Sequence, residues 1–127
     1  MGKPSARPIG VTIISVLGMI VSIMIVLMGL LAILLGAAFG ALFGPAVTAF
    51  GGLVGVIFII IGGIIFIANW FLWKMKKIGW ILVIIFEVIG LLAAILTLPV
   101  NIILGIVEII INGLVIFYLY ENRNLFK

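Results

Sequence analysis

Residues 9–73 contain no Asp, Glu, Lys or Arg, and this absence of charge constrains the fold more than any motif does. Over all 127 residues, 68% are hydrophobic and 8% are charged, whereas about a quarter of the residues in a soluble domain are charged. A small soluble domain buries only part of the surface that its chain exposes, so it could not hide this much apolar surface from water. The chain is therefore predicted to be an integral membrane protein.

Four runs are long enough to cross a bilayer, which takes about 20 mostly apolar residues. They cover residues 9–35, 53–73, 78–97 and 101–120. Each is predicted to be a helix, because a helix satisfies its own backbone hydrogen bonds in lipid and an open strand does not. A barrel would need strands of alternating polarity, and "GVIFIIIGGIIFI" does not alternate. The predicted fold class is an all-α integral membrane protein with four transmembrane helices.

The basic residues indicate the side of the membrane on which each connection lies. Lys74, Lys76 and Lys77 lie in "WKMKKIG" between the second and third runs, and the connections after the first and third runs are uncharged. The remaining basic residues precede the first run or follow the fourth (Lys3, Arg7, Arg123, Lys127). Because basic residues near span ends stay in the cytoplasm, both termini are predicted to be cytoplasmic in a multi-pass protein of the cell membrane. This placement favours the lipid bilayer as partner and argues against nucleic acid.

A short internal repeat predicts how the helices are arranged. Residues 55–77 align with residues 105–127, and six of the 23 positions are identical, including the pairs Gly55/Gly105 and Lys77/Lys127. Such a repeat implies two hairpins related by an axis along the membrane normal. The chain is thus predicted to form a single domain, residues 1–127, made of two tandem helical hairpins of the same orientation.

The first hairpin is longer than the second because of a Gly- and Ala-rich segment, residues 36–52, that is predicted to lie on the outer side. Gly36, Gly40 and Gly44 are spaced by four, so they are predicted to form one helix face that allows another helix to approach closely. Pro45 is expected to break or restart the helix. Projecting helices, a re-entrant segment and an ordinary long loop are all compatible with this sequence. Small residues of the first span are also assigned to helix packing (Gly18, Ser22, Gly29).

Two acidic residues, Glu87 and Glu108, lie inside predicted spans. An ionisable side chain at mid-bilayer costs about 3 kcal/mol or more and is a functional candidate by default. Asn112 and Asn101 lie on the same stripe of the fourth span as Glu108, at steps of three or four residues. The connection "LPVN" is short, so the third and fourth spans are predicted to be antiparallel neighbours with these polar groups facing each other at a similar depth.

This intramembrane polar cluster, which comprises Glu87, Glu108, Asn112 and Asn101, has two interpretations. It is either a site that binds a proton or a cation, or a set of hydrogen bonds between helices worth about 0.6 kcal/mol per contact. Gly90 and Gly105 are predicted to let the two helices approach closely around it.

Most catalytic chemistry is excluded by composition. The chain has no His and no Cys, which rules out thiolate nucleophiles, the Ser-His triad and the usual zinc ligand sets. Acid–base catalysis would need positioned partners, and the spans offer only two Glu, a few Asn and hydroxyl groups. No catalytic residue, metal ligand or cofactor is predicted, and the chain is expected not to be an enzyme.

Three segments carry a resemblance to a known family: "RPIGVTIISVLGMI", "FLWKMKKIGWILVII" and "LVIFYLYENRNLFK". Together they resemble small four-span membrane proteins of archaea and some bacteria. Those proteins begin with an Arg-Pro-x-Gly-Val pattern, carry a basic loop between aromatic residues, and close with tyrosines and a charged tail. The resemblance covers most of the chain. It implies a four-span topology and no particular reaction, because no activity is assigned to that family.

The uncharged outer segment, the small-residue helix faces and the lack of reactive groups predict a non-catalytic protein. We expect a structural or accessory subunit of a membrane complex, or a homo-oligomer, whose partners are other membrane proteins or copies of itself. The alternative is a small proton- or cation-coupled transporter or channel that works through Glu87 and Glu108.

Overall fold

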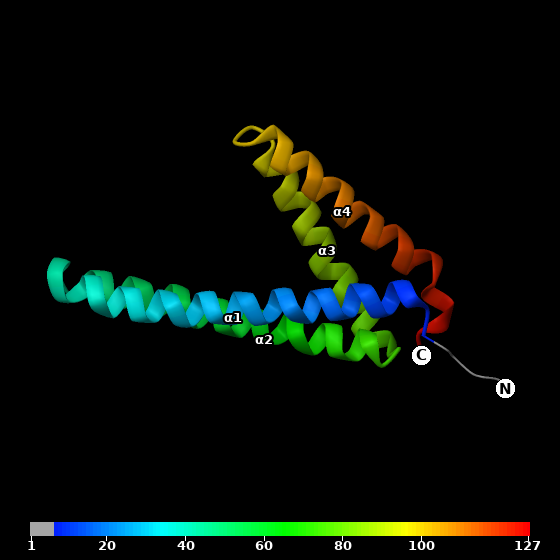
Figure 1. Ribbon diagram of the computed structural model, residues 1–127, viewed down its shortest axis with the longest axis horizontal. Coiled ribbons are helices and arrows are strands. Elements are labelled where there is room, and N and C mark those ends of the chain that lie inside the picture. The colour runs from blue at the N-terminus through cyan, green and yellow to red at the C-terminus, as the bar shows by residue number, and fades with distance from the viewer. Residues whose placement is uncertain (1–6) are drawn as a thin grey trace. The chain divides into compact units, whose positions relative to one another are not determined.

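The computed structural model describes residues 7–127, which form four long α-helices and one short 3-10 helix (Figure 1). The elements in chain order are α1 (Ile9–Phe43), α2 (Pro45–Trp73), α3 (Lys77–Thr97), α4 (Ile102–Glu121) and η1 (Arg123–Leu125). The four α-helices are each long and apolar enough to cross a membrane. The prediction of an all-helical chain with four such helices is therefore confirmed. Lys3, one of the basic residues expected on the cytoplasmic side, lies outside the described residues.

Gly44 is the single residue between α1 and α2. Its φ of 111° lies in the left-handed region that favours glycine, and its N–H donates a hydrogen bond to the Gly40 carbonyl at 2.8 Å. Pro45 begins α2, where the missing N–H of proline is not needed by the helix. The Gly- and Ala-rich segment is therefore helical on both sides of Gly44, which excludes an irregular long loop.

The two halves of the chain differ in helix length. At 1.5 Å per residue, α1 with 35 residues is about 52 Å long and α2 with 29 residues is about 44 Å long. The helices α3 and α4, with 21 and 20 residues, are each about 30 Å long. A bilayer has a hydrocarbon core of about 30 Å, so α3 and α4 match its thickness while α1 and α2 exceed it.

The chain divides into two compact units. Unit 1 contains the described residues up to Val16 together with Ala68–Lys127. Unit 2 is Leu17–Ile67. Each of α1 and α2 thus contributes residues to both units.

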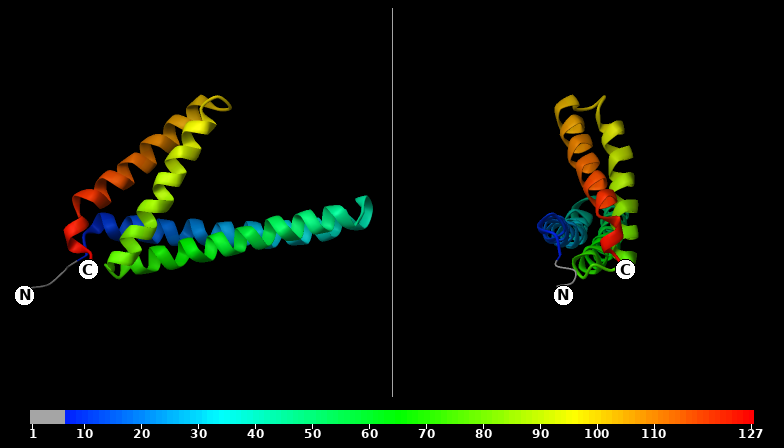
Figure 2. Two further views of the ribbon diagram at one scale, coloured as in Figure 1. Left: turned by 180° about the vertical axis from the view of Figure 1, so that it is seen from behind. Right: turned by 90° about the vertical axis from the view of Figure 1, so that its right-hand side faces the viewer.

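In unit 2, α1 and α2 lie side by side and run in opposite directions (Figure 2). Gly29 of α1 faces Gly55 of α2. Two turns later in α1 and one turn earlier in α2, Gly36 faces Gly51. A Cβ added to Gly51 would lie 2.6 Å from the Cα of Gly36. The two backbones are close because these positions carry no side chain, which is the usual role of small residues where membrane helices meet.

In unit 1, α3 and α4 pack against each other and are joined by the short connection 98–101. The buried apolar core gathers at the opposite end, where α3 begins and α4 ends. It draws on α1, α2, α3, α4 and the segment after η1 (Val11, Ala68, Leu72, Val83, Leu119, Phe126). The indole N–H of Trp80 ties α3 to α4 at this end by donating to the Leu119 carbonyl at 2.7 Å.

Candidate functional site

The polar faces of α3 and α4 meet at Gly90 and Asn112. A Cβ at Gly90 would lie 3.2 Å from the Asn112 side-chain nitrogen, so the amide occupies the space that glycine leaves open. Further toward the connection, a Cβ at Gly105 would lie 3.1 Å from the Cα of Leu98. Both glycines therefore lie where the neighbouring segment comes close, and the stripe on α4 faces α3 at this point.

The register of this contact sets the positions of the two carboxyl groups. Glu87 lies three residues from Gly90 toward the start of α3, and Glu108 lies four residues from Asn112 toward the start of α4. Since the helices run in opposite directions, the two Glu positions are separated by about 10 Å along the helix axes. The two Glu positions therefore lie on either side of Asn112 along the helix pair. The expectation that they face each other at a similar depth is not met. The expected depths placed the start of α3 level with the last residues of the fourth span, near Tyr120. In the structure the start of α3 at Lys77 is level with Lys127, whose carbonyl accepts a hydrogen bond from the Lys77 N–H.

Each carboxyl group has one oxygen that is buried and makes no hydrogen bond. These atoms are Oε2 of Glu87 and Oε1 of Glu108. Both residues are half-buried, as is Asn112, which lies between them along the helix pair. Protonation of the carboxyl group lowers the cost of burying such an oxygen because it removes the charge, whereas a bound cation or a donor from another molecule would supply the missing partner. Among residues 7–127, no group of three or more His, Cys, Asp or Glu could hold a metal ion.

Asn101 has a different role from the other polar residues of the predicted cluster. It is the N-cap of α4, and its Oδ1 accepts a hydrogen bond from the Leu104 N–H at 3.0 Å. A side chain at this position satisfies one of the free N–H groups in the first turn of a helix. Asn101 is exposed at the connection, so it lies at the end of the α4 stripe and away from Glu87.

The small residues that the sequence assigned to helix packing in the first half lie mostly between α1 and α2. Gly40 faces Thr48, and a Cβ at Gly62 would lie 2.9 Å from the Ser22 carbonyl. The Ser22 hydroxyl is buried and donates to the Met19 carbonyl at 2.6 Å, so its hydrogen bond stays within α1. Gly18 is half-buried one turn before Ser22.

Gly44 is an exception to that assignment. A face formed by Gly36, Gly40 and Gly44 would require α1 to continue past Phe43, but the helix ends there. Gly44 adopts a positive φ, and no heavy atom lies within 4 Å of where its Cβ would be. Its role is to make the turn, and the prediction that it packs a helix is wrong.

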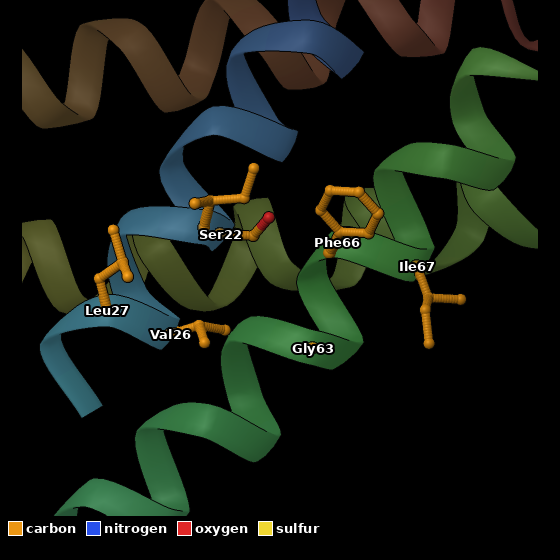
Figure 3. A pocket seen from close by; sticks show the side chains of 7 residues that line it. Ser22, Val26, Leu27, Gly63, Phe66 and Ile67 are labelled. Carbon is orange, nitrogen blue, oxygen red and sulfur yellow. The ribbon is translucent and has the colours of Figure 1, made fainter. Parts of the chain in front are cut away.

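An apolar groove of about 330 Å³ lies between α1 and α2 within unit 2 (Figure 3). Gly63 forms part of its wall, and Phe66 and Leu27 border it from the two helices (Figure 3). A side chain at Gly63 would meet no heavy atom within 4 Å, in contrast to its neighbour Gly62. Gly63 therefore lines the groove beside the contact between α1 and α2 and is not packed within that contact.

The predicted basic loop is part of a structured end of unit 1, which we call the basic cap. It comprises the turn 74–76 with the adjoining ends of α2 and α3, Arg7 with the start of α1, and residues 119–127. Lys74, Lys76 and Lys77 are exposed on it. Arg7 is partly buried, stacks 4.4 Å from the centroid of the Trp73 ring and donates to the Trp73 carbonyl at 3.2 Å.

Several residues that organise the basic cap gave no signal in the sequence. Phe126 is only 5% exposed and joins the core although it follows the last α-helix. Gly79 allows α3 to start against the end of α2, because a Cβ there would meet the backbone of Phe71 and Leu72. The packing of the tail depends on contacts far apart in sequence, and no local pattern reveals it.

Comparison of the chain with protein-family models, with curated proteins and with solved structures finds no match.

Proposed function

We propose that this protein is a non-catalytic, multi-pass protein of the cell membrane that acts as a structural or accessory subunit. It would assemble with other membrane proteins or with copies of itself. The observation that carries the proposal is the apolar surface of α1 and α2 beyond the length that a bilayer core covers.

That surface lies at the end of unit 2 that contains Gly44. Leu42, Phe43 and Phe50 are 76%, 72% and 69% exposed there, and the surrounding segment 36–52 has no charged residue. Exposing apolar surface to water costs about 25 cal/mol per Å². Contact with another membrane subunit would remove this cost for both partners.

Open glycine positions give separate support for helix partners. A Cβ added to Gly63 on α2 or to Gly113 on α4 would meet no heavy atom within 4 Å, so neither glycine is needed for packing within its own unit. Glycine weakens a helix by about 1 kcal/mol relative to alanine, and it is enriched where membrane helices meet. We propose that the faces carrying Gly63 and Gly113 contact helices of neighbouring subunits.

For the topology, we propose that both termini face the cytoplasm and that the helices form two tandem hairpins of the same orientation. The support is the collection of six described basic residues at the basic cap (Arg7, Lys74, Lys76, Lys77, Arg123, Lys127). The chain's three tryptophans lie at the same end, as expected for anchors at a membrane interface.

The mass of the particle tests the proposal. We expect protein extracted in mild detergent to have a protein mass well above the 13.7 kDa of one chain. Replacing Phe43 by Lys should reduce that mass, because it places a charge in the covered surface. The matched control is Val100→Lys, in the connection between α3 and α4, where the side chain is 87% exposed and the mass should not change.

A mass of one chain, with no cross-linked partner in intact membranes, would contradict the subunit proposal. The length of α1 and α2 would then have to be accommodated by a steep tilt in the membrane.

The second candidate function is transport of protons or cations through the α3/α4 pair, and the unpartnered oxygens of Glu87 and Glu108 favour it. If the carboxyl group of Glu87 binds and releases a proton during transport, Glu87→Gln should abolish pH-driven flux into liposomes that contain a pH dye. An amide has the same shape but cannot titrate. If the two carboxyl groups only join the helices, the unaltered protein should show no flux and the variant no phenotype. We expect the second result.

A further inference from the structure

The turn 74–76 of the basic cap is held in one conformation by backbone hydrogen bonds. The Met75 N–H donates to the Leu72 carbonyl at 2.9 Å, and the Lys76 N–H donates to the Phe71 carbonyl at 3.0 Å. The chain segment that ends at Lys127 lies along this turn. The Lys127 N–H donates to the Met75 carbonyl at 3.2 Å, and the Lys127 carbonyl accepts from the Lys77 N–H at 3.0 Å.

This conformation directs the lysines of the turn outward. Met75, in the left-handed region with φ 61°, packs against the buried core. Lys74, Lys76 and Lys77 around it are exposed. Because the backbone of the turn is already ordered, less conformational entropy is lost when the three lysines bind an anion than if the turn itself had to fold.

Aromatic rings surround the same surface. The ammonium group of Lys74 lies 5.2 Å from the centroid of the Trp70 ring, and the Arg123 guanidinium lies 4.2 Å from that of Tyr120. Trp and Tyr side chains favour the boundary between hydrocarbon and water. Their position next to the lysines places the charges at the depth of lipid headgroups when α3 and α4 cross the membrane.

The charge of the cap is almost entirely positive. Its one acidic residue is Glu121, which is exposed at the end of α4, and within residues 7–127 no ion pair engages the three lysines of the turn. At the other end of α3 and α4, the connection 98–101 has no charged residue. Attraction for anions is therefore confined to one end of the helix pair.

We infer that the basic cap is a binding surface for anionic lipids, in which Lys74, Lys76 and Lys77 bind the phosphate groups of lipid headgroups. Clusters of Lys and Arg next to a membrane helix attract anionic headgroups, which are already concentrated at that depth. A polyanion in solution would have to lie on the membrane surface to reach the same residues. The inference concerns lipid selection and holds whether or not the protein is a subunit of a complex.

Quenching of tryptophan fluorescence by brominated lipids tests the inference. All three tryptophans, Trp70, Trp73 and Trp80, lie at the basic cap, so the intrinsic fluorescence reports on lipids at this end only. The full chain is reconstituted with brominated phosphatidylglycerol or brominated phosphatidylcholine. We expect phosphatidylglycerol to bind at least about fivefold more tightly, since one lysine near an anionic surface contributes about this factor. The preference should weaken as the salt concentration rises.

Two variants and one soluble competitor complete the experiment. The triple variant Lys74→Gln, Lys76→Gln, Lys77→Gln should lose the preference for phosphatidylglycerol, and the triple Lys→Arg variant at these positions should keep it. Glycerol phosphate at millimolar concentration should not displace the lipid. Equal quenching by the two lipids in the unaltered protein would overturn the inference without any variant. Displacement by glycerol phosphate would also overturn it, because the surface would then be a site for soluble phosphate esters.

Discussion

Gly90 of α3 faces Asn112 of α4, and a Cβ added to Gly90 would lie 3.2 Å from the Asn112 side-chain nitrogen. The contact places a polar amide between two membrane-length helices. It also fixes the register that staggers Glu87 and Glu108 on either side of Asn112. A larger side chain at position 90 should therefore disturb both the polar cluster and the packing of α3 against α4.

Replacing Gly90 by Val should destabilise the α3/α4 pair by about 1–3 kcal/mol, because the added methyl groups would displace the Asn112 amide. The change can be followed by tryptophan fluorescence during an SDS titration in mixed micelles. The control is Gly113→Val on α4, where a side chain meets no other atom of this chain within 4 Å. It should weaken contacts with a neighbouring subunit but hardly move the midpoint of the α3/α4 pair. Equal effects of the two substitutions would show that Gly90 does not face α4.

Adjacent glycines of α2 offer a sharper comparison. A Cβ at Gly62 would lie 2.7 Å from Cγ2 of Val26 and 2.9 Å from the Ser22 carbonyl, while Gly63 has open space. Gly62→Ala should force α1 and α2 apart and cost about 1–3 kcal/mol, whereas Gly63→Ala should leave the pair intact. Hydrogen exchange measured on peptides from α1 and α2 should be faster only in the Gly62 variant. Faster exchange in the Gly63 variant alone would contradict the packing described for unit 2.

Phe126 should contribute strongly to the stability of the basic cap. Truncation to Ala in a buried site removes about 3–5 kcal/mol, and Phe126 is 5% exposed in the core of unit 1. The neighbouring Leu125 is 39% exposed, so Leu125→Ala serves as the control and should have a small effect. Thermal unfolding monitored by tryptophan fluorescence measures both, and a similar loss in the two variants would contradict the buried position of Phe126.

The proposed topology can be tested on a background without cysteine, since the chain has none. A cysteine at Asn124 should resist an impermeant thiol reagent in intact cells and react after the cells are opened. A cysteine at Val100, which is 87% exposed in the connection between α3 and α4, should react from outside. Labelling of Asn124→Cys in intact cells would reverse the proposed orientation.

The sequence predicted the four helices well because long apolar runs without alternating polarity have only one stable backbone arrangement in lipid. It left open whether the first two helices continue through residues 36–52, because projecting helices, a re-entrant segment and a long loop were all compatible with that stretch. Glycine and proline usually mark helix ends, yet Gly36, Gly40 and Gly51 are used for close packing inside helices. Only Gly44 and Pro45 mark a helix end and a helix start.

Part of the polar cluster was also predictable. Helical spacing places Glu108 and Asn112 on one stripe, and a short connection brings that stripe near α3. The register was not predictable, because it depends on how far α4 and the following segment extend past the start of α3. That extent is set by long-range contacts, among them the hydrogen bond from the Lys77 N–H to the Lys127 carbonyl.

The core of the basic cap joins Val11 to Phe126, residues more than a hundred positions apart in the chain. A ribosome releases these segments at very different times, so in a chain that spans the membrane as proposed, the early helices would enter the bilayer before their last contacts exist. The glycine contacts of α1 and α2, by comparison, are complete once Gly62 has been synthesised. Insertion of this protein should thus proceed in two stages, with an early pair that can form during translation and a closing step that waits for the final segment.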